Sequence, residues 1–258
     1  MSRIRAKLRL EMPHRHLGSD RANKPFLPAA FGPPMPPIKI AYYSDLLCVW
    51  AWLGQRRLDQ LVADFGDRIE IETHFCSVFA DAWGKIEGGK GFDGFNAHLR
   101  DVTAPFPHVE LHPRVWLDAR PRSSASAHLF IKAIELIEAE DGEALAWTDR
   151  ASTKAAWALR CAFFEHGRDI SSYEIQCEFA DEFGVARSRI EEKLCSSEAI
   201  TALLRDYHIC SEHGIKGSPT FVMNEGRQRL FGNVGYKLIE ANVQELLRNR
   251  PVDQASWC

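Results

Sequence analysis

The first part of the chain has the apolar pattern of a strand, a helix and a second strand. Residues 38–43, Ile-Lys-Ile-Ala-Tyr-Tyr, are typical of a buried strand. Apolar residues then recur at helical spacing from 58 to 65, and Gly66 ends the predicted helix. Residues 69–74 alternate in polarity, which predicts another strand. Short connections between the three elements predict a right-handed crossover unit, the beginning of a parallel α/β layer.

The middle of the chain shows helical patterns only. Its apolar stripes lie within residues 127–137, 155–163, 175–179 and 190–207. Ser171 and Glu174 have the spacing of a capping box, so one helix is expected to start at Ser171. No strand signal interrupts residues 85–213, which predicts an inserted helical bundle.

The pattern returns to strands near the end of the chain. Residues 220–223 predict a strand, and residues 229–231 predict its hairpin partner across a turn near Gly226. Apolar residues between 238 and 247 then predict a final helix. The predicted order is therefore βαβ, a helical insertion, and ββα.

Residues 1–37 differ from the rest of the chain. They are basic at first and contain six prolines between positions 25 and 37. Such proline density prevents regular structure, and few apolar groups are present to anchor the segment. We expect an N-terminal extension that is disordered or lies on the surface.

The composition of the chain limits which functions and partners are expected. The chain has 258 residues and a net charge of -3, so nothing in it predicts a nucleic acid or an anionic membrane as partner. It has no apolar run long enough to span a bilayer, and the basic N-terminus lacks the apolar run of a signal peptide. Seven cysteines without framework spacing indicate reduced thiols and a cytoplasmic location.

The turn between the first strand and the first helix carries the candidate chemistry. Residues 44–54 read Ser-Asp-Leu-Leu-Cys-Val-Trp-Ala-Trp-Leu-Gly. This segment resembles the active-site turn of DsbA-like oxidoreductases of the FrnE type, which run Asp, two residues, Cys-Pro-Trp-Cys. It is also similar to the kappa-class glutathione transferases and 2-hydroxychromene-2-carboxylate isomerases, which have Ser-Pro-aromatic after the same Asp.

Three later segments extend the resemblance over residues 38–248. Residues 214–222, Gly-Ile-Lys-Gly-Ser-Pro-Thr-Phe-Val, resemble the cis-proline segment that faces the reactive cysteine in thioredoxin-like proteins. Phe231-Gly232 precedes the last helix as in that group, and residues 165–170 resemble part of the FrnE insertion. The resemblance implies an α/β, thioredoxin-like fold with an inserted all-helical domain. Residues 38–84 and 214–250 would form the thioredoxin-like domain and residues 85–213 the insertion.

The resemblance implies that Cys48 is the catalytic residue, and elementary chemistry agrees. A thiolate is the attacking form of cysteine, and the N-terminus of a helix favours negative charge. We therefore expect a partly open Cys48 sulfur with a pKa below that of a free cysteine. Pro219 is expected to follow a cis bond, which would leave the Ser218 backbone free to pair with a peptide or glutathione. The expected substrate-binding residues are Trp50, Ser218, Pro219, Gly232 and Asn233.

The segment also departs from the family pattern. Ala51 stands where the second cysteine is expected, and Val49 replaces the proline. Cys48 therefore has no neighbouring thiol to resolve a mixed disulfide. Glutathione could resolve it, or Cys76 could; alternatively Cys48 could position a glutathione thiolate as the serine of the isomerases does. Val234 weakens this last reading, because those families usually carry Asp there.

The hypothesis is a thiol–disulfide oxidoreductase with a single active-site cysteine, linked to glutathione. The alternatives are a glutathione-dependent isomerase or transferase, and a thioredoxin-fold binding protein without turnover. No bound cofactor is expected, with glutathione as a co-substrate. The partner would be a small thiol or a disulfide-containing peptide, and a homodimer is left open. Cys210, His208 and His213 lie on one predicted helix without a second ligand pair, so no metal site is expected.

Overall fold

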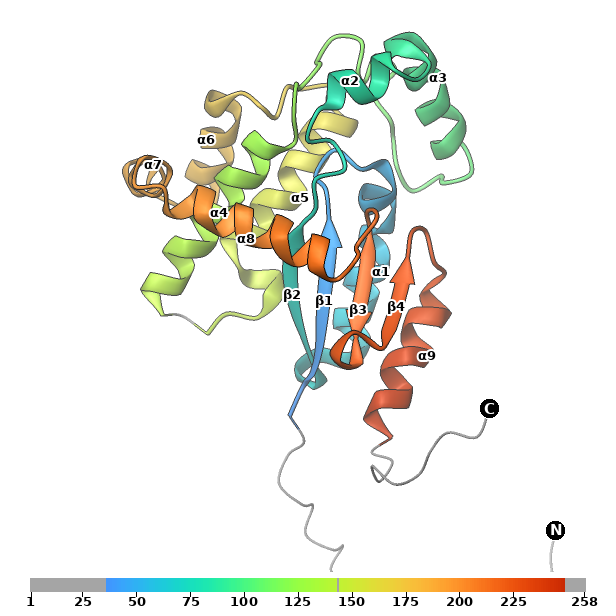
Figure 1. Ribbon diagram of the computed structural model, residues 1–258, viewed down its shortest axis with the longest axis vertical. Helices are drawn as coiled ribbons and strands as arrows, with labels where there is room; N and C mark the ends of the chain where they lie inside the picture. The colour runs from blue at the N-terminus through green and yellow to red at the C-terminus, as the bar shows by residue number, and fades with distance from the viewer. Residues whose placement is uncertain (1–35, 143, 249–258) are drawn as a thin grey trace, which may run out of the picture. The chain divides into compact units, whose positions relative to one another are not determined.

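A four-stranded mixed sheet is at the centre of the structure, a computed structural model that describes residues 36–142 and 144–248. The strands are β1 (Ile38–Ser44), β2 (Ile69–Phe75), β3 (Thr220–Met223) and β4 (Gln228–Phe231). Their order is β2-β1-β3-β4; β1 is parallel to β2 and antiparallel to β3, which is antiparallel to β4 (Figure 1). The βαβ unit and the C-terminal hairpin predicted from the sequence are thereby confirmed.

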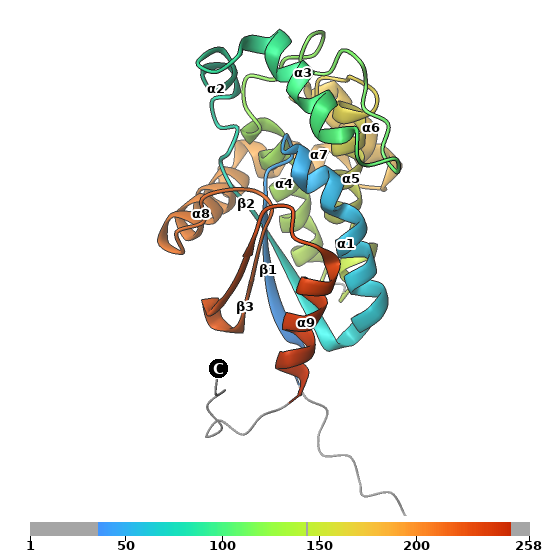
Figure 2. The same ribbon diagram turned by 90° about the vertical axis from the view of Figure 1, so that its right-hand side faces the viewer.

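Two helices cover one face of the sheet and a third covers the other (Figure 2). Helices α1 (Val49–Phe65) and α9 (Tyr236–Leu247) pack on Ile40 and Tyr42 of β1. The next residue, Tyr43, points to the opposite face, where it packs with Cys210 of α8 (Glu198–Glu212). The alternation of side chains along an extended strand produces this division.

The predicted helical insertion is also observed. Between β2 and β3 the described residues contain helices but no strand. The remaining helices are α2 (Ala82–Glu87), α3 (Gly91–Thr103), α4 (Ala125–Asp141), α5 (Ala151–Phe164), α6 (Tyr173–Glu182) and α7 (Arg187–Cys195), with short 3-10 helices η1 (Gly66–Arg68), η2 (Trp147–Asp149) and η3 (Asn224–Gly226). The apolar stripes of α4 and α5 share a core with the first turn of α1, so the insertion packs directly beside Cys48.

One predicted helix start is wrong. Helix α6 begins at Tyr173 with Ser172 as its N-cap residue, and no side chain caps it. The hydroxyl of Ser171 instead donates to Asp169, 2.6 Å away, so a local turn uses the group that the capping box required.

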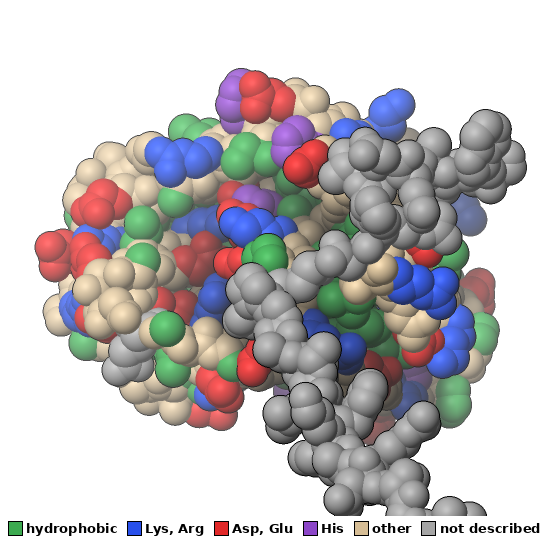
Figure 3. All heavy atoms as spheres, turned by 90° about the horizontal axis from the view of Figure 1, so that it is seen from below, with side chains coloured by type: hydrophobic (Ala, Val, Ile, Leu, Met, Phe, Trp, Pro, Cys, Tyr) green, Lys and Arg blue, Asp and Glu red, His purple; other side chains and the backbone are tan. Residues whose placement is uncertain are grey.

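Charge and hydrophobicity of the described residues agree with the composition. Basic and acidic side chains are interspersed where described residues are visible in Figure 3. None of the described helices combines the length and the apolar character needed to cross a membrane. The predicted extension, residues 1–37, lies almost wholly outside the described residues.

Candidate functional site

Cys48 lies at the end of β1, where the chain enters α1. It is the N-cap residue of the helix, with φ -85° and ψ 114°. Its carbonyl oxygen accepts hydrogen bonds from the backbone N–H groups of Ala51 (3.1 Å) and Trp52 (3.2 Å). No side chain caps this helix, so its first N–H groups face the sulfur-bearing residue. The sequence thus places the only cysteine of the turn at the positive end of a helix dipole.

Asp45 holds the turn in shape. Its carboxylate accepts hydrogen bonds from the backbone N–H groups of Leu47 (2.8 Å) and Phe79 (2.9 Å), and from the hydroxyl of Ser124 (2.8 Å). The side chain is fully buried, and burial raises its pKa from 3.8 to about 6, although these hydrogen bonds oppose the rise. The carboxylate therefore joins the active-site turn, the β2–α2 connection and the start of α4.

Ser218 meets the same turn from the other end of the chain. The Cys48 thiol donates a hydrogen bond to the Ser218 carbonyl, with a sulfur–oxygen distance of 3.1 Å. The Ser218 hydroxyl accepts from the backbone N–H of Asp45 at 2.9 Å. The Ser218–Pro219 peptide bond is cis. The structure therefore brings two segments 170 residues apart into direct contact through the sulfur.

The expected ionisation of Cys48 is wrong for this structure. The residue is only 6% exposed, and burial raises the pKa of its thiol above the ordinary cysteine value. Hydrogen bonds from the side chain of Ser218 and from the backbone of Ala51 and Trp50 act in the opposite direction, while the negative charge of Asp45 adds to the rise. Desolvation thus outweighs the helix N-terminus, and the resting thiol is protonated at neutral pH.

The other expected substrate-binding residues are only partly brought together. Pro219 is buried, and its carbonyl accepts from the backbone N–H of Gly232 at 2.8 Å. Gly232 has φ +80°, a left-handed conformation that suits glycine. Trp50 is half-buried and contacts Phe106 edge-on, with 6.3 Å between ring centroids. Asn233 is exposed, and its side chain has no hydrogen-bond partner among the described residues.

Phe231 adds an apolar surface beside the Ser218 segment. The side chain is 62% exposed, and an added Cβ at Gly217 would lie 2.5 Å from its ring. Glycine at position 217 therefore allows this ring to lie against the backbone that precedes Ser218 and Pro219. An exposed aromatic at this place offers a contact to any group that approaches Cys48 along the cis-proline segment.

Cys76, the other thiol considered for disulfide resolution, is buried. Burial raises its pKa strongly, and nearby negative groups add to the rise. Its backbone N–H donates to the carbonyl of Ser44 at 3.0 Å, which keeps the residue against β1. Unlike Cys48, Cys76 follows a strand and is not at the N-terminus of a helix, so no free helical N–H groups are available to stabilise its thiolate.

Two buried residues of the insertion support the turn and were not predicted. His128 Nε2 accepts from the backbone N–H of Leu46 at 3.1 Å, so its Nδ1 carries the proton and faces the Tyr207 hydroxyl, 3.2 Å away. Burial lowers the pKa of His128 well below 6.5, in agreement with this neutral form. Arg160 donates to the Ser44 hydroxyl at 2.8 Å. Only their places beside the apolar stripes of α4 and α5 could have indicated these roles.

The candidate metal ligands near the end of α8 have other partners. His213 Nδ1 is 3.0 Å from the Tyr43 hydroxyl, and the Cys210 thiol donates to the carbonyl of Phe75 at 3.4 Å. The part of the chain that the structure describes contains no group of three or more His, Cys, Asp or Glu residues placed to hold a metal ion.

Comparisons with known proteins agree with the fold. The family profile of the DSBA-like thioredoxin domain matches residues 39–244. Among solved structures, a candidate protein disulfide isomerase from Nitrosomonas europaea superposes with a TM-score of 0.67 at 16% identity, over 83% of this chain and 100% of the other. The cytosolic disulfide reductase DsbM from Pseudomonas aeruginosa gives 0.59 at 17% identity, over 82% and 99%. A 2-hydroxychromene-2-carboxylate isomerase gives 0.55 at 18% identity, over 82% and 97%.

Proposed function

The chain belongs to the DSBA-like thioredoxin domain family, and we propose that it is a thiol–disulfide oxidoreductase in which Cys48 is the only active-site thiol and glutathione the co-substrate. The observation that carries this proposal is the contact of the Cys48 sulfur with the Ser218 carbonyl at the start of α1. That contact places the sulfur beside a backbone segment that a peptide or glutathione can pair with.

The proposed reaction has two exchanges. Cys48 loses its thiol proton, and its thiolate attacks the disulfide of a glutathionylated substrate and forms a mixed disulfide with the glutathione half. The substrate sulfur leaves and takes up a proton, so that it is released as a thiol. A free glutathione thiolate then attacks that mixed disulfide, which gives oxidised glutathione and restores Cys48. Two glutathione molecules, one of them from the substrate, leave as oxidised glutathione, and the substrate gains the two electrons.

Ala51 is the reason for assigning the second step to glutathione. Ala51 is buried and has no thiol, and Cys76 is buried after β2, away from the helix N-terminus that Cys48 occupies. An external thiol is then the group able to reach the mixed disulfide. The six cysteines of the described residues are all free thiols, which suits a reducing compartment such as the cytoplasm. The substrate would be a small thiol in mixed disulfide form or a disulfide-containing peptide.

The raised pKa of Cys48 also supports a second candidate function. A protonated thiol is a hydrogen-bond donor, and a serine hydroxyl is one as well. In a glutathione-dependent isomerase or transferase, Cys48 would donate to the thiolate of bound glutathione and would not itself be oxidised. This function predicts that Cys48→Ser retains turnover of an aromatic electrophile.

The decisive experiment exposes the protein to oxidised glutathione and maps the modified cysteines by mass spectrometry. Oxidoreductase chemistry predicts a persistent adduct on Cys48, together with turnover of a glutathionylated peptide that Cys48→Ser abolishes. Cys195→Ser is the matched control, because Cys195 is an exposed thiol on α7. If the Cys48→Ser variant turned over the peptide as fast as the native protein does, the proposed reaction would be excluded.

A further inference from the structure

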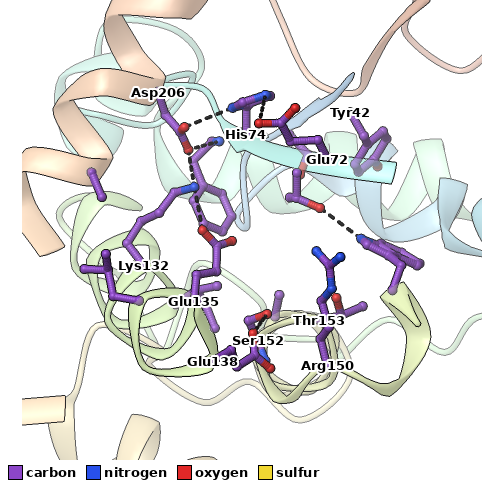
Figure 4. Close-up of a pocket in the computed structure, with 18 of the residues that line it drawn as sticks. Tyr42, Glu72, His74, Lys132, Glu135, Glu138, Arg150, Ser152, Thr153 and Asp206 are labelled. Atoms are coloured by element: carbon purple, nitrogen blue, oxygen red, sulfur yellow. Dashed lines mark hydrogen bonds and ion pairs between the residues drawn. The ribbon is translucent and has the colours of Figure 1, made fainter. Parts of the chain in front are cut away.

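A cavity of about 490 Å³ lies away from Cys48, between the free edge of β2 and the helices of the insertion. One wall carries His74 of β2 with Lys132 of α4 and Asp206 of α8, and the facing wall carries residues from the start of α5 (Figure 4). The volume is within the range of sites that hold small organic molecules.

The acidic groups of the cavity are matched by partners of their own. Lys132 forms ion pairs with Glu135 at 2.7 Å and with Asp206 at 2.6 Å, and Asp206 also accepts from His74 at 3.0 Å. Glu138 accepts from both the backbone N–H and the hydroxyl of Ser152, at 3.1 and 2.5 Å. These carboxylates have their partners within the cavity and leave none for a further cation.

Two deeply buried groups of the cavity lack such partners. Arg160 is 4% exposed, and within residues 36–142 and 144–248 no carboxylate lies within 4.0 Å of its guanidinium. Among the described residues its only hydrogen bond goes to Ser44, and its Nε has no partner there. The hydroxyl of Tyr42, whose side chain is 2% exposed, also has no hydrogen-bond partner in the described part of the chain. A buried cation without a counter-ion is costly, so this end of the cavity is built to receive an anion.

We propose that this cavity binds a small organic carboxylate, with Arg160 and the Tyr42 hydroxyl holding the carboxylate group. Arg160 is the buried guanidinium of the cavity, and its planar fork suits a carboxylate; Arg150 and Arg205 also line the cavity but are less buried. A phosphate dianion would bring a second negative charge towards Glu135 and Glu138. The apolar part of the ligand would pack on Leu58 and Trp147, which also line the cavity.

Isothermal titration calorimetry with benzoate and 3-phenylpropanoate tests this proposal, with benzamide and inorganic phosphate as comparison ligands. Both carboxylates are expected to bind the full-length protein at least about tenfold more tightly than benzamide or phosphate, because a charge-assisted pair is lost in benzamide. Arg160→Met is expected to weaken benzoate binding at least about tenfold, and Tyr42→Phe about threefold or more.

Arg187→Met, at a surface ion pair of α7, is the matched control and should bind benzoate as the native protein does. Circular dichroism checks that each variant is folded. If Arg160→Met is not folded, the affinity of Tyr42→Phe for benzoate and the comparison of benzoate with benzamide test the proposal instead. Equal affinity for benzoate and benzamide, or no carboxylate binding at millimolar concentration, would overturn the proposal. Cys48→Ser should bind benzoate normally, so this result is independent of the proposed redox function.

Discussion

Asp45 offers a sharp test of how the active-site turn is held. Replacing it by Asn keeps the size of the side chain but removes the charge and one acceptor. The native carboxylate accepts from two backbone N–H groups and from Ser124, and it is fully buried. In the native protein, burial is the largest effect on the pKa of the Asp45 carboxyl, and it raises this pKa. The variant has no titrating group at this position.

The size and sign of the expected effect follow from that pKa. A rise from 3.8 to about 6 corresponds to roughly 3 kcal/mol. Because the folded state holds the proton more tightly than the unfolded state, the contribution of Asp45 to stability is complete below about pH 4 and is lost as the pH rises through about 6. At pH 4 part of the unfolded-state carboxylate is already ionised, so the stability difference between native protein and Asp45→Asn should shift against the native protein by roughly 2.4 kcal/mol between pH 4 and pH 7.

Urea unfolding followed by circular dichroism at several pH values measures this difference. Asp67→Asn, in the exposed 3-10 turn η1, controls for the removal of a surface charge. The difference in the free energy of unfolding between native protein and Asp45→Asn would refute the reasoning if it stayed constant to within about 0.5 kcal/mol across this pH range. The pKa of Asp45 would then be the same in the folded and the unfolded state.

Three further changes test the surroundings of Cys48. Ala51→Cys restores the usual spacing of two thiols, so oxidised glutathione should yield an internal disulfide instead of a persistent adduct, as mass spectrometry would show. Ser218→Ala removes the acceptor of the Asp45 N–H, and urea unfolding should show a loss of about 1–3 kcal/mol; no loss would mean that this N–H finds another acceptor. Gly217→Ala should turn the exposed Phe231 ring away at a cost below about 1 kcal/mol and weaken binding of a glutathionylated peptide, measured as a higher KM.

The sheet and the insertion could be predicted because their signals are local. The apolar residues 38–43 and 69–74, the helical stripe between them and the later helical stripes each follow from the spacing of neighbours along the chain. The pairing of β1 with β3 needed one further step, the resemblance of residues 214–222 to a cis-proline segment. The described elements agree with these predictions except at the start of α6.

The electrostatics of the site could not be predicted in this way. The pKa of Cys48 depends on desolvation by the surrounding fold and on a hydrogen bond from the side chain of Ser218, which is far away in the sequence. His128 and Arg160 look like single polar residues beside an apolar stripe, and only the packing of α4 and α5 on the turn gives them partners. Burial and partners of this kind are properties of the assembled fold, so the sequence pattern correctly placed the sulfur but wrongly predicted its ionisation.

The proposed carboxylate site and Cys48 are electrostatically connected, which leads to a final prediction. The positive charge of Arg160 lowers the pKa of Asp45, and the negative charge of Asp45 raises the pKa of Cys48. A carboxylate bound to Arg160 would cancel the first effect, so Asp45 would be protonated to a greater extent near pH 6.5 and the Cys48 thiolate would form more readily. Saturating benzoate should therefore speed the alkylation of Cys48 by iodoacetamide at pH 6.5, while Cys195 reacts at an unchanged rate. If benzoate binds and both rates stay the same, the cavity and the thiol are not coupled through Asp45.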